Sequence, residues 1–210
     1  MMEVAAIIPA YNEEKNIGLV LSVITQIPEI TEVVVVNDGS TDRTSQIAYS
    51  FGVKVIELQE NQGKSLAMWA GVQHTTSPII LFLDADLIGL TQGQVKDMIL
   101  PIIKGYADMT LGIFCSGRSV TDLAQKIAPY LTGQRAMKRW VLNGLDQEDW
   151  QTGFGIEMAI TRLAKNSNLR IMKVPLTNVT HAMKEEKMGL VKGVAARAKM
   201  YWEIIKQLSN

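Results

Sequence analysis

Two aspartates separated by one residue follow an apolar run in the first half of the chain. The segment IILFLDADL places Asp84 and Asp86 directly after residues 79–83, which are all apolar. Alternate side chains of a strand point to the same side, so we expect the two carboxylates to lie close together and to repel each other. Binding of Mg²⁺ or Mn²⁺ to the carboxylate oxygens would remove that repulsion. From the tripeptide alone, the alternative is that one aspartate caps a helix and the other is solvated.

Two earlier polar segments offer groups that suit a nucleotide. Asp38 follows the apolar run 32–36, and its carboxylate could accept hydrogen bonds from a base or a ribose. Lys64 follows a glycine and could place a cation near a phosphate. The alternative for Asp38 is an ordinary turn in which Ser40 or Asp42 caps a helix. Neither a Walker P-loop nor a G-x-G-x-x-G fingerprint is present in these segments.

The elements that must position these groups alternate regularly in the first half. Apolar runs predict strands, and helical spacing of apolar residues predicts helices between them. The expected strands are 4–8, 32–36, 53–58 and 79–83, and the expected helices are 13–26, 42–51 and 62–72. This alternation predicts an α/β fold with a mostly parallel central sheet and helices on both faces. Such sheets bind ligands outside the carboxyl ends of their strands, which is where the polar turns lie.

The second half shows a less regular pattern. Helices are expected at 94–104, 122–143, 152–165 and 190–208, strands at 108–114, 169–174 and 177–182, and a mobile charged loop at 184–189. Pro101 is expected to end or kink the first of these helices, and Pro129 and Gly133 to interrupt the second. The sequence contains no internal repeat and no low-complexity linker, so we expect a single domain over residues 1–210.

The composition is that of a globular protein. Of its 210 residues, 47% are apolar, and the formal net charge is zero. Residues 1–100 carry 12 acidic and 5 basic side chains, whereas residues 101–210 carry 9 and 16. The basic second half would suit an anionic partner, or its charges are simply those of solvated helix faces. One cysteine, no signal-peptide pattern and no apolar run of membrane-spanning length predict a cytoplasmic protein.

Four segments together resemble glycosyltransferase family 2. They are IIPAYNEEKNI, EVVVVNDGSTDRT, ENQGKSLAMWAG and LFLDADL, in that order over roughly residues 3–90. The resemblance implies a GT-A fold with a Rossmann-like nucleotide-binding half. It also implies a nucleotide-sugar donor, inversion at the anomeric carbon and a requirement for Mg²⁺ or Mn²⁺. Residues 1–90 would then bind the donor, residues 91–189 the acceptor, and residues 190–210 would form a C-terminal amphipathic helix.

The resemblance also assigns residues to the nucleotide-sugar site. The implied set is Pro9, Tyr11, Glu13, Asp38, Lys64, Asp84 and Asp86. The first three would line the nucleotide pocket, Asp38 would hold the base, and Lys64 would lie near the base or the phosphates. Asp84 and Asp86 would form the D-x-D pair, with Asp86 the more direct metal ligand. A similar likeness, to phosphoglycerate-glucosylating enzymes, implies that His181 joins the metal; the alternative is a structural or exposed histidine.

Two motifs concern the acceptor. Gly133 and Arg135 in LTGQRAMKR resemble an acceptor loop, in which Arg135 could grip an anion in bidentate fashion. The segment QTGFGIEM resembles polyprenyl-phosphate sugar transferases and glucosyl-3-phosphoglycerate synthases, and Glu157 in it would be the catalytic base. Asp149 in QEDW is the second base candidate. A phosphate acceptor would need no strong base, and Glu157 would then be a helix-start carboxylate.

The resulting hypothesis is a metal-dependent, inverting glycosyltransferase. We expect a UDP- or GDP-sugar as donor, an anionic or lipid-linked acceptor, and no nucleic-acid partner. The C-terminal helix could lie on a membrane surface, pack on the domain or form a homodimer. The alternatives are a nucleotidylyltransferase, which usually has a basic glycine-rich loop after the first strand, and a non-catalytic nucleotide-binding module of the same fold.

Overall fold

The structure is a computed structural model that describes residues 3–115, 132–151 and 156–182. The chain divides into two compact units, residues 1–180 and 181–210. The first unit is described below, and of the second the structure describes only its first two residues.

Several predictions fall outside the described residues. They are the N-terminal part of the expected helix 122–143, the loop 184–189 and the amphipathic helix 190–208. Within the described ranges, no helix combines the length and the apolar character that a membrane span requires.

The first half has the predicted alternation of strands and helices. Its elements are β1 (Val4–Ala10), α1 (Ile17–Ile24), β2 (Ile30–Asp38), α2 (Thr44–Ser50), β3 (Lys54–Leu58), α3 (Lys64–Gln73) and β4 (Ile79–Phe82). The first helix begins at Ile17 and not at Glu13, as was predicted. The reason is that the backbone N–H groups of residues 12–14 donate to side chains of the turn after β2, which holds this stretch outside the helix.

The second half departs from the prediction at one important place. Its elements are β5 (Leu87–Ile88), α4 (Gln92–Ile103), β6 (Met109–Phe114), β7 (Arg135–Lys138), the 3₁₀ helix η2 (Arg139–Gly144), α6 (Gln147–Gln151), α7 (Ile156–Asn166), β8 (Ile171–Leu176) and β9 (Thr180–His181). The helix expected over 122–143 is wrong for residues 135–138, which form a strand. This strand pairs with β4 on one side and β6 on the other, and these two ladders outweigh the local helical pattern.

Two smaller details of the second half concern Pro101 and the basic residues at and just after the end of β7. Helix α4 continues two residues past Pro101, so this proline does not end it; its ring-fixed φ suits a helix, and a single N–H donor is missing. Lys138, one of the basic residues of the second half, does not lie on a solvated helix face. It ends β7 and pairs with Asp108, and Arg139 donates to the Val72 carbonyl at the end of α3.

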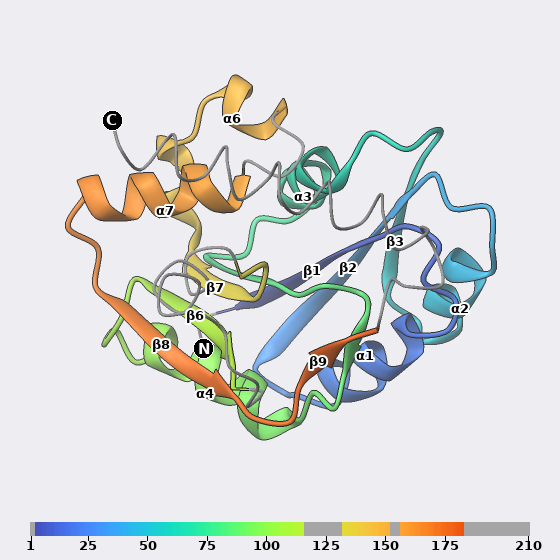
Figure 1. Ribbon diagram of the computed structural model, residues 1–210, viewed down its shortest axis with the longest axis horizontal. Helices are drawn as coiled ribbons and strands as arrows, with labels where there is room; N and C mark the ends of the chain where they lie inside the picture. The colour runs from blue at the N-terminus through green and yellow to red at the C-terminus, as the bar shows by residue number, and fades with distance from the viewer. Residues whose placement is uncertain (1–2, 116–131, 152–155, 183–210) are drawn as a thin grey trace, which may run out of the picture. The chain divides into compact units, whose positions relative to one another are not determined.

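Seven of the nine strands in the described residues form one mostly parallel sheet. Their order is β3-β2-β1-β4-β7-β6-β8, and only β7 runs antiparallel to its neighbours (Figure 1). The carboxyl ends of β1 to β4 therefore meet at one edge, as the sequence predicts. Because β7 is antiparallel, its amino end arrives at this same edge, with Arg135 opposite Phe82. The residues that precede β7 are thereby placed beside the turn that follows β4.

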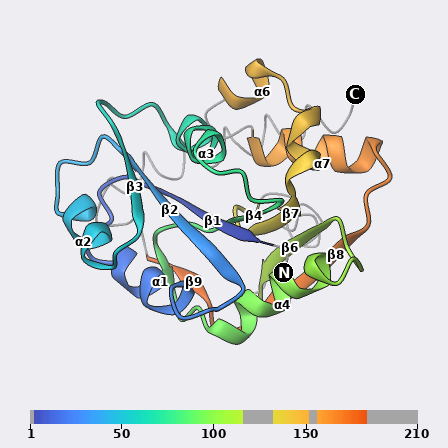
Figure 2. The same ribbon diagram turned by 180° about the vertical axis from the view of Figure 1, so that it is seen from behind.

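Helices cover both faces of the sheet. Helices α1, α2 and α4 pack on one face, and α3, α6 and α7 pack on the other, as Figures 1 and 2 show from opposite sides. Strand β1 contributes to both cores: Val4, Ala6 and Ile8 face the first set of helices, and Ala5 and Ile7 face the second. A strand buried on both faces reads as a continuous apolar run, which explains why the sequence revealed it.

Candidate functional site

The first two turns of the carboxyl edge are joined to each other by hydrogen bonds. The Asn12 N–H donates to Ser40 Oγ over 2.9 Å, and the Thr41 N–H donates to Asn12 Oδ1 over 2.9 Å. The Glu13 N–H donates to Thr44 Oγ1 over 2.8 Å. Side chains of one turn thus fix the backbone of the other, and the edge presents a rigid scaffold.

The residues predicted to line a nucleotide pocket lie on this scaffold. Pro9 is half-buried near the end of β1, and Tyr11 directly after it is 46% exposed. Glu13 is half-buried, and its carboxylate accepts a hydrogen bond from Asn16 Nδ2 over 2.9 Å. An exposed aromatic ring beside a ligand-binding edge is a surface on which a base can stack.

Asp38 fixes the entry to α3. It is almost fully buried, and its two carboxylate oxygens accept the N–H groups of Gln62 and Gly63 over 2.8 and 3.0 Å. Gly39 allows the two loops to meet: its φ is +70°, and a Cβ there would lie 2.6 Å from the Glu60 carbonyl carbon. A carboxylate has about four lone-pair positions, so Asp38 can hold this loop and still accept a ligand N–H.

Lys64, the first residue of α3, stands between two carboxylates. Its Nζ lies 2.7 Å from Asp84 Oδ1 and 2.9 Å from Glu157 Oε1. Burial disfavours the charged ammonium, but the charges of Asp84 and Glu157 outweigh burial and raise the pKa of Lys64. The lysine is therefore charged at neutral pH and neutralises part of an acidic cluster.

Gly133 lies against this ion pair. A Cβ at this position would be 2.5 Å from Lys64 Nζ and 2.9 Å from Asp84 Oδ1. Any side chain here would displace one of the two charged groups. The sequence predicts an acceptor role for Gly133, and the structure brings this residue to the D-x-D aspartate and the lysine.

Arg135, the other predicted acceptor residue, is fully buried. Its Nε donates to the Thr132 carbonyl over 2.7 Å, and its Nη1 donates to Thr161 Oγ1 over 3.2 Å. Burial lowers the pKa of Arg135 to about 10, and the charge of Glu157 acts in the opposite direction. The guanidinium therefore stays charged and supports the site from inside the core.

The two base candidates lie in different surroundings. Glu157, in the first turn of α7, is 6% exposed and contacts Lys64. Asp149 is engaged in a helix start: it exchanges hydrogen bonds with Asp146 over 2.9 and 3.2 Å and pairs with Arg162 over 2.9 Å. Of the two, Glu157 is the one that the structure joins to Lys64 and, through it, to Asp84.

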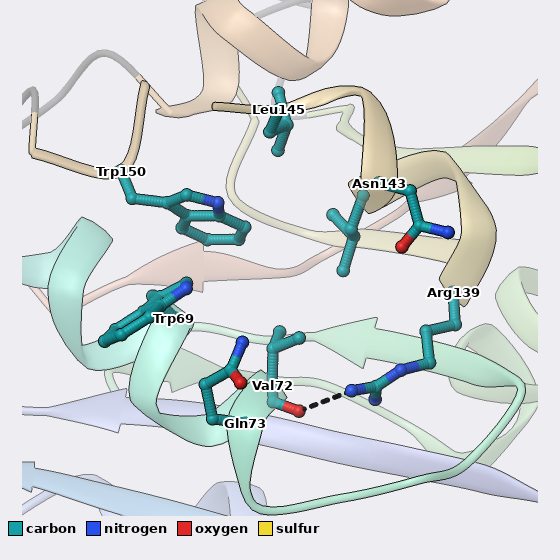
Figure 3. Close-up of a pocket in the computed structure, with 8 residues that line it drawn as sticks. Trp69, Val72, Gln73, Arg139, Asn143, Leu145 and Trp150 are labelled. Carbon is teal, nitrogen blue, oxygen red and sulfur yellow. Dashed lines mark hydrogen bonds between the residues drawn. The ribbon is translucent and has the colours of Figure 1, made fainter. Parts of the chain in front are cut away.

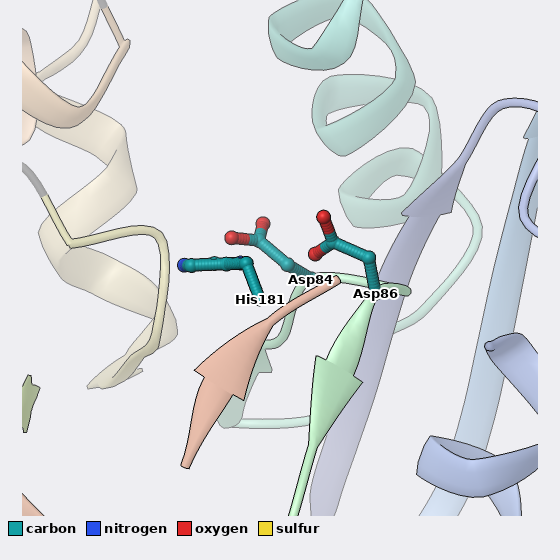
Figure 4. Close-up of side chains that lie close together, drawn as sticks. All are labelled: Asp84, Asp86 and His181. Carbon is teal, nitrogen blue, oxygen red and sulfur yellow. The ribbon is translucent and has the colours of Figure 1, made fainter. Parts of the chain in front are cut away.

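Asp84, Asp86 and His181 offer a cluster of metal-ligating atoms. One carboxylate oxygen of each aspartate and one ring nitrogen of His181 lie within 4.8 Å of one another (Figure 4). Asp86 is buried, with 6% of its surface exposed. Two carboxylates and an imidazole are ligands that divalent cations accept, and the paired negative charges need compensation. The donor set thus fits a divalent cation such as Mg²⁺ or Mn²⁺.

Gln134 is a site residue that the sequence did not reveal. It is fully buried and contacts both the backbone and the carboxylate of Asp84. The only signal was its place between Gly133 and Arg135 in a segment already assigned to the acceptor. Glutamine is mostly found at the protein surface, so its residue type gave no sign that this side chain would be buried.

A separate hollow lies beside α3, away from these residues. This pocket of about 170 Å³ is lined by Trp69, Val72, Gln73, Arg139, Leu142, Asn143, Leu145 and Trp150. The two tryptophans come from α3 and α6, and Arg139 closes one side by donating to the Val72 carbonyl (Figure 3). None of the predicted site residues lines it, and it has no carboxylate, so the chemistry belongs to the carboxyl edge.

A curated relative matches the first part of the chain. The 4,4'-diaponeurosporenoate glycosyltransferase of Staphylococcus aureus (strain USA300) is 42% identical over 98 residues. The match covers 44% of this chain and 26% of the relative. The chain therefore spans about a quarter of the length of this relative.

Solved structures share the fold. Glucosyl-3-phosphoglycerate synthase from Mycobacterium tuberculosis, in complex with Mg²⁺ and UDP, is 24% identical with a TM-score of 0.73. The likeness covers 87% of this chain and 72% of that protein. The same enzyme with Mn²⁺, UDP and glucosyl-3-phosphoglycerate is 25% identical with a TM-score of 0.71, over 87% and 72% of the two chains. This likeness confirms the predicted α/β fold of the GT-A type.

The family profile covers both halves of the described chain. The profile of Glycosyl transferase family 2 matches residues 5–162, which include the aspartate pair, Lys64, Gly133 and Glu157. This range is well over half of the chain. The chain belongs to glycosyl transferase family 2.

Proposed function

We propose that this protein transfers a sugar from a UDP- or GDP-sugar to an acceptor, with inversion at the anomeric carbon and with Mg²⁺ or Mn²⁺. The observation that carries the proposal is the cluster of Asp84, Asp86 and His181 beside Lys64 at the carboxyl edge of the sheet. The complexes of the structural neighbours with UDP and with Mg²⁺ or Mn²⁺ support it.

The edge has separate places for the parts of a nucleotide sugar. Tyr11 offers an exposed ring for a base, and Asp38 offers the free acceptor positions of a fixed carboxylate. Asp86 and His181 would hold the cation together with Asp84. A bound divalent cation supplies positive charge for the leaving diphosphate.

The transfer would take place in one substitution step at the anomeric carbon of the sugar. The acceptor oxygen attacks the anomeric carbon, the bond from this carbon to the diphosphate oxygen breaks, and the configuration inverts. Lys64 adds a fixed positive charge beside the site, and fixed charges of this kind stabilise charge that develops in the transition state. If the acceptor is a hydroxyl, Glu157 takes its proton.

The acceptor divides into two chemical classes. A hydroxyl acceptor needs a base, for which Glu157 is the first candidate and Asp149 the second. A phosphate acceptor is already an oxyanion and needs none. The basic balance of residues 101–210 favours an anionic acceptor, either a small metabolite or a lipid-linked phosphate. Turnover of wild type and E157Q with each class separates them, because only a hydroxyl acceptor depends on proton removal by Glu157.

The decisive experiment measures donor binding and donor turnover. Thermal unfolding with a panel of UDP- and GDP-sugars, with and without Mn²⁺, should identify a donor that raises Tm, since a ligand at 100 times its Kd stabilises by about 2.7 kcal/mol. Hydrolysis of that donor should stop when EDTA is added and resume when Mn²⁺ is restored. Absence of metal-dependent turnover with every donor would contradict the proposal.

The same experiment distinguishes the alternatives. A nucleotidylyltransferase would form a nucleotide sugar from a sugar phosphate and a nucleoside triphosphate. The turn after β1 carries Glu13 and Glu14 where that class usually has a basic glycine-rich loop, which disfavours it. A non-catalytic module would bind the nucleotide sugar without releasing the sugar or the nucleotide.

Membrane contact and dimerisation remain predictions that concern residues 190–210. Co-sedimentation of the full chain with liposomes should exceed that of a chain ending at Gly189 if the amphipathic helix lies on the bilayer. Equal co-sedimentation, together with a loss of dimer in light scattering, would instead assign this helix to a subunit interface.

A further inference from the structure

We infer that Gln134 is a positioning residue whose side-chain amide fixes the Asp84 carboxylate in the orientation that donor and metal binding require. The inference rests on the proposed function, because the orientation of Asp84 matters only if a donor binds there. Gln134 itself is fully buried and would act through Asp84.

Gln134 and Asp84 exchange two hydrogen bonds of opposite direction. The Asp84 backbone N–H donates to Gln134 Oε1 over 2.9 Å, and Gln134 Nε2 donates to Asp84 Oδ2 over 2.7 Å. The second distance is that of a charge-assisted hydrogen bond. Since one bond holds the main chain of Asp84 and the other its carboxylate, the amide limits rotation of the aspartate side chain between them.

The backbone that carries Gln134 is also fixed. Its N–H donates to Thr132 Oγ1 over 3.1 Å, and its carbonyl accepts the Gly112 N–H over 2.9 Å. The residue is fully buried, so water cannot replace either contact of its amide. A flipped amide would set Oε1 against a carboxylate and Nε2 against an N–H group, and both contacts are repulsive.

Gln134 and Lys64 contact different oxygens of the Asp84 carboxylate. Lys64 lies 2.7 Å from Oδ1, and the amide of Gln134 lies 2.7 Å from Oδ2. Two donors on two different oxygens determine the plane of the carboxylate, whereas one donor would leave it free to turn. Mutation of a residue that orients a metal-ligating group in this way typically lowers metal affinity or activity by about 10- to 100-fold.

The choice of glutamine is chemically specific. Glutamate at this position would be nearly isosteric and could accept the Asp84 N–H, but it would place a second negative charge beside the carboxylate. Leucine would keep most of the volume and lose both hydrogen bonds. The two substitutions therefore perturb Asp84 by different routes, repulsion and loss of orientation.

A double-mutant cycle on the full-length protein tests the inference. The Kd of Mn²⁺ with UDP and of Mn²⁺ with GDP is measured by calorimetry for the wild type, Q134L, Q134E, D84A and the two double variants. We expect Q134L and Q134E to weaken binding about 10- to 100-fold. In the D84A background the same substitutions should change Kd less than about threefold, because coupled residues are not additive.

A matched control separates positioning from general stability. Thr75 is also buried, and it accepts the Ser77 N–H over 3.2 Å and contacts Glu32. It lies before β4, at the opposite end of this strand from Asp84. T75V should therefore lower Tm without changing Kd. If Q134L does not fold, Q134E keeps the size of the side chain and carries the test.

The outcomes are distinct. Unchanged Kd in both Gln134 variants, or an equal loss with and without Asp84, overturns the inference and leaves the proposed function intact. If the wild type binds neither Mn²⁺–UDP nor Mn²⁺–GDP, the proposed function fails, and the inference fails with it.

Discussion

Lys64 Nζ lies 2.9 Å from Glu157 Oε1 and connects the first turn of α3 to the first turn of α7. The lysine belongs to the half of the chain that carries the nucleotide motifs, and the glutamate belongs to the half assigned to the acceptor. A single charge therefore links the two proposed substrate sites. Changes at this contact should affect both donor and acceptor chemistry.

Removal of the lysine charge should reduce both activity and stability. K64M leaves Asp84 and Glu157 close together without their counter-charge. We expect the free energy of unfolding to fall by about 2 kcal/mol, less than for a fully buried pair because Lys64 is partly exposed. Turnover of the donor should fall about 100-fold, as for other fixed charges at reacting centres.

A second lysine–glutamate pair provides the control for that experiment. Lys96 lies 3.6 Å from Glu29, away from the site, and K96M should cost less than about 1 kcal/mol. Urea unfolding and steady-state kinetics measure both variants. Equal behaviour of K64M and K96M would show that the Lys64 contacts have no special role.

A single methyl group at Gly133 should disrupt the ion pair. In G133A the new Cβ would overlap Lys64 Nζ, which must move away from Asp84. We expect donor affinity to fall and the free energy of unfolding to fall by about 1–3 kcal/mol, the typical cost of overpacking. G93A is the control: nothing lies within 4 Å of a Cβ there, the residue is helical, and alanine should raise stability by up to about 1 kcal/mol. Tight donor binding by G133A would contradict this.

Asp86 should be the aspartate on which metal affinity depends most. We expect D86N to weaken Mn²⁺ binding at least about 10-fold, because an amide lacks the negative charge that the cation needs. D97N removes an exposed acid on α4 and should leave Mn²⁺ affinity unchanged. Electron paramagnetic resonance of free Mn²⁺ measures both affinities. Wild-type affinity in D86N would remove this residue from the proposed metal site.

Substitutions of Glu157 and Asp149 should have different effects, the first on kcat and the second on stability. With a hydroxyl acceptor, E157Q should lower kcat by at least about 100-fold, since general bases contribute on this scale. D149A should instead lower stability by about 1 kcal/mol, because it removes the carboxylate that accepts the Asp146 N–H at the start of α6 and pairs with Arg162. Rapid-quench kinetics and thermal unfolding test the pair. Loss of turnover in D149A at unchanged stability would reverse the assignment.

The stability contributed by Asp108 should depend on pH. Hydrogen bonds from Arg170 and Lys138 lower the pKa of this buried carboxyl below its ordinary value of 3.8, against the opposing effect of burial. Because the folded pKa is the lower one, the contribution is complete above the unfolded pKa and disappears as pH falls through the folded pKa. D108N should cost about 3 kcal/mol at pH 7.

The difference between wild type and D108N should therefore narrow below about pH 4. Urea unfolding at several pH values between 3 and 7 measures it. A difference that stays constant over this range would mean that Asp108 acts through packing and not through its charge.

The first half of the fold was predictable because its strands are buried on both faces. Runs such as Ile79–Phe82 are then apolar throughout, and the helices between them show their own spacing. The acidic residues at the carboxyl edge were therefore also predictable, because parallel strands bring Asp38 and Asp84 to the same edge for any conformation of the loops. Only the start of α1 was misplaced by more than two residues, because contacts with residues distant in sequence hold residues 12–14.

The second half was less predictable because its elements are short and held by distant partners. Strand β7 has only the four residues Arg-Ala-Met-Lys, and this short sequence does not indicate that they pair with β4 and β6. The same holds for Gln134, whose partner lies fifty residues earlier. Asp149 is different: the spacing from Asp146 is that of a reciprocal helix cap, so its structural role could have been read from the sequence.

The antiparallel course of β7 has a consequence for how such proteins diversify. Strands β6 and β7 are neighbours in the sheet, so the end of β6 at Phe114 and the start of β7 at Arg135 are two fixed points of the chain. The entropy of closing a loop rises only slowly with its length. A segment between fixed anchors can therefore be lengthened, shortened or exchanged with little cost to the sheet. Changes in length between β6 and β7 should therefore leave the pairing of β7 with β4, and with it the edge that carries Asp84, unchanged.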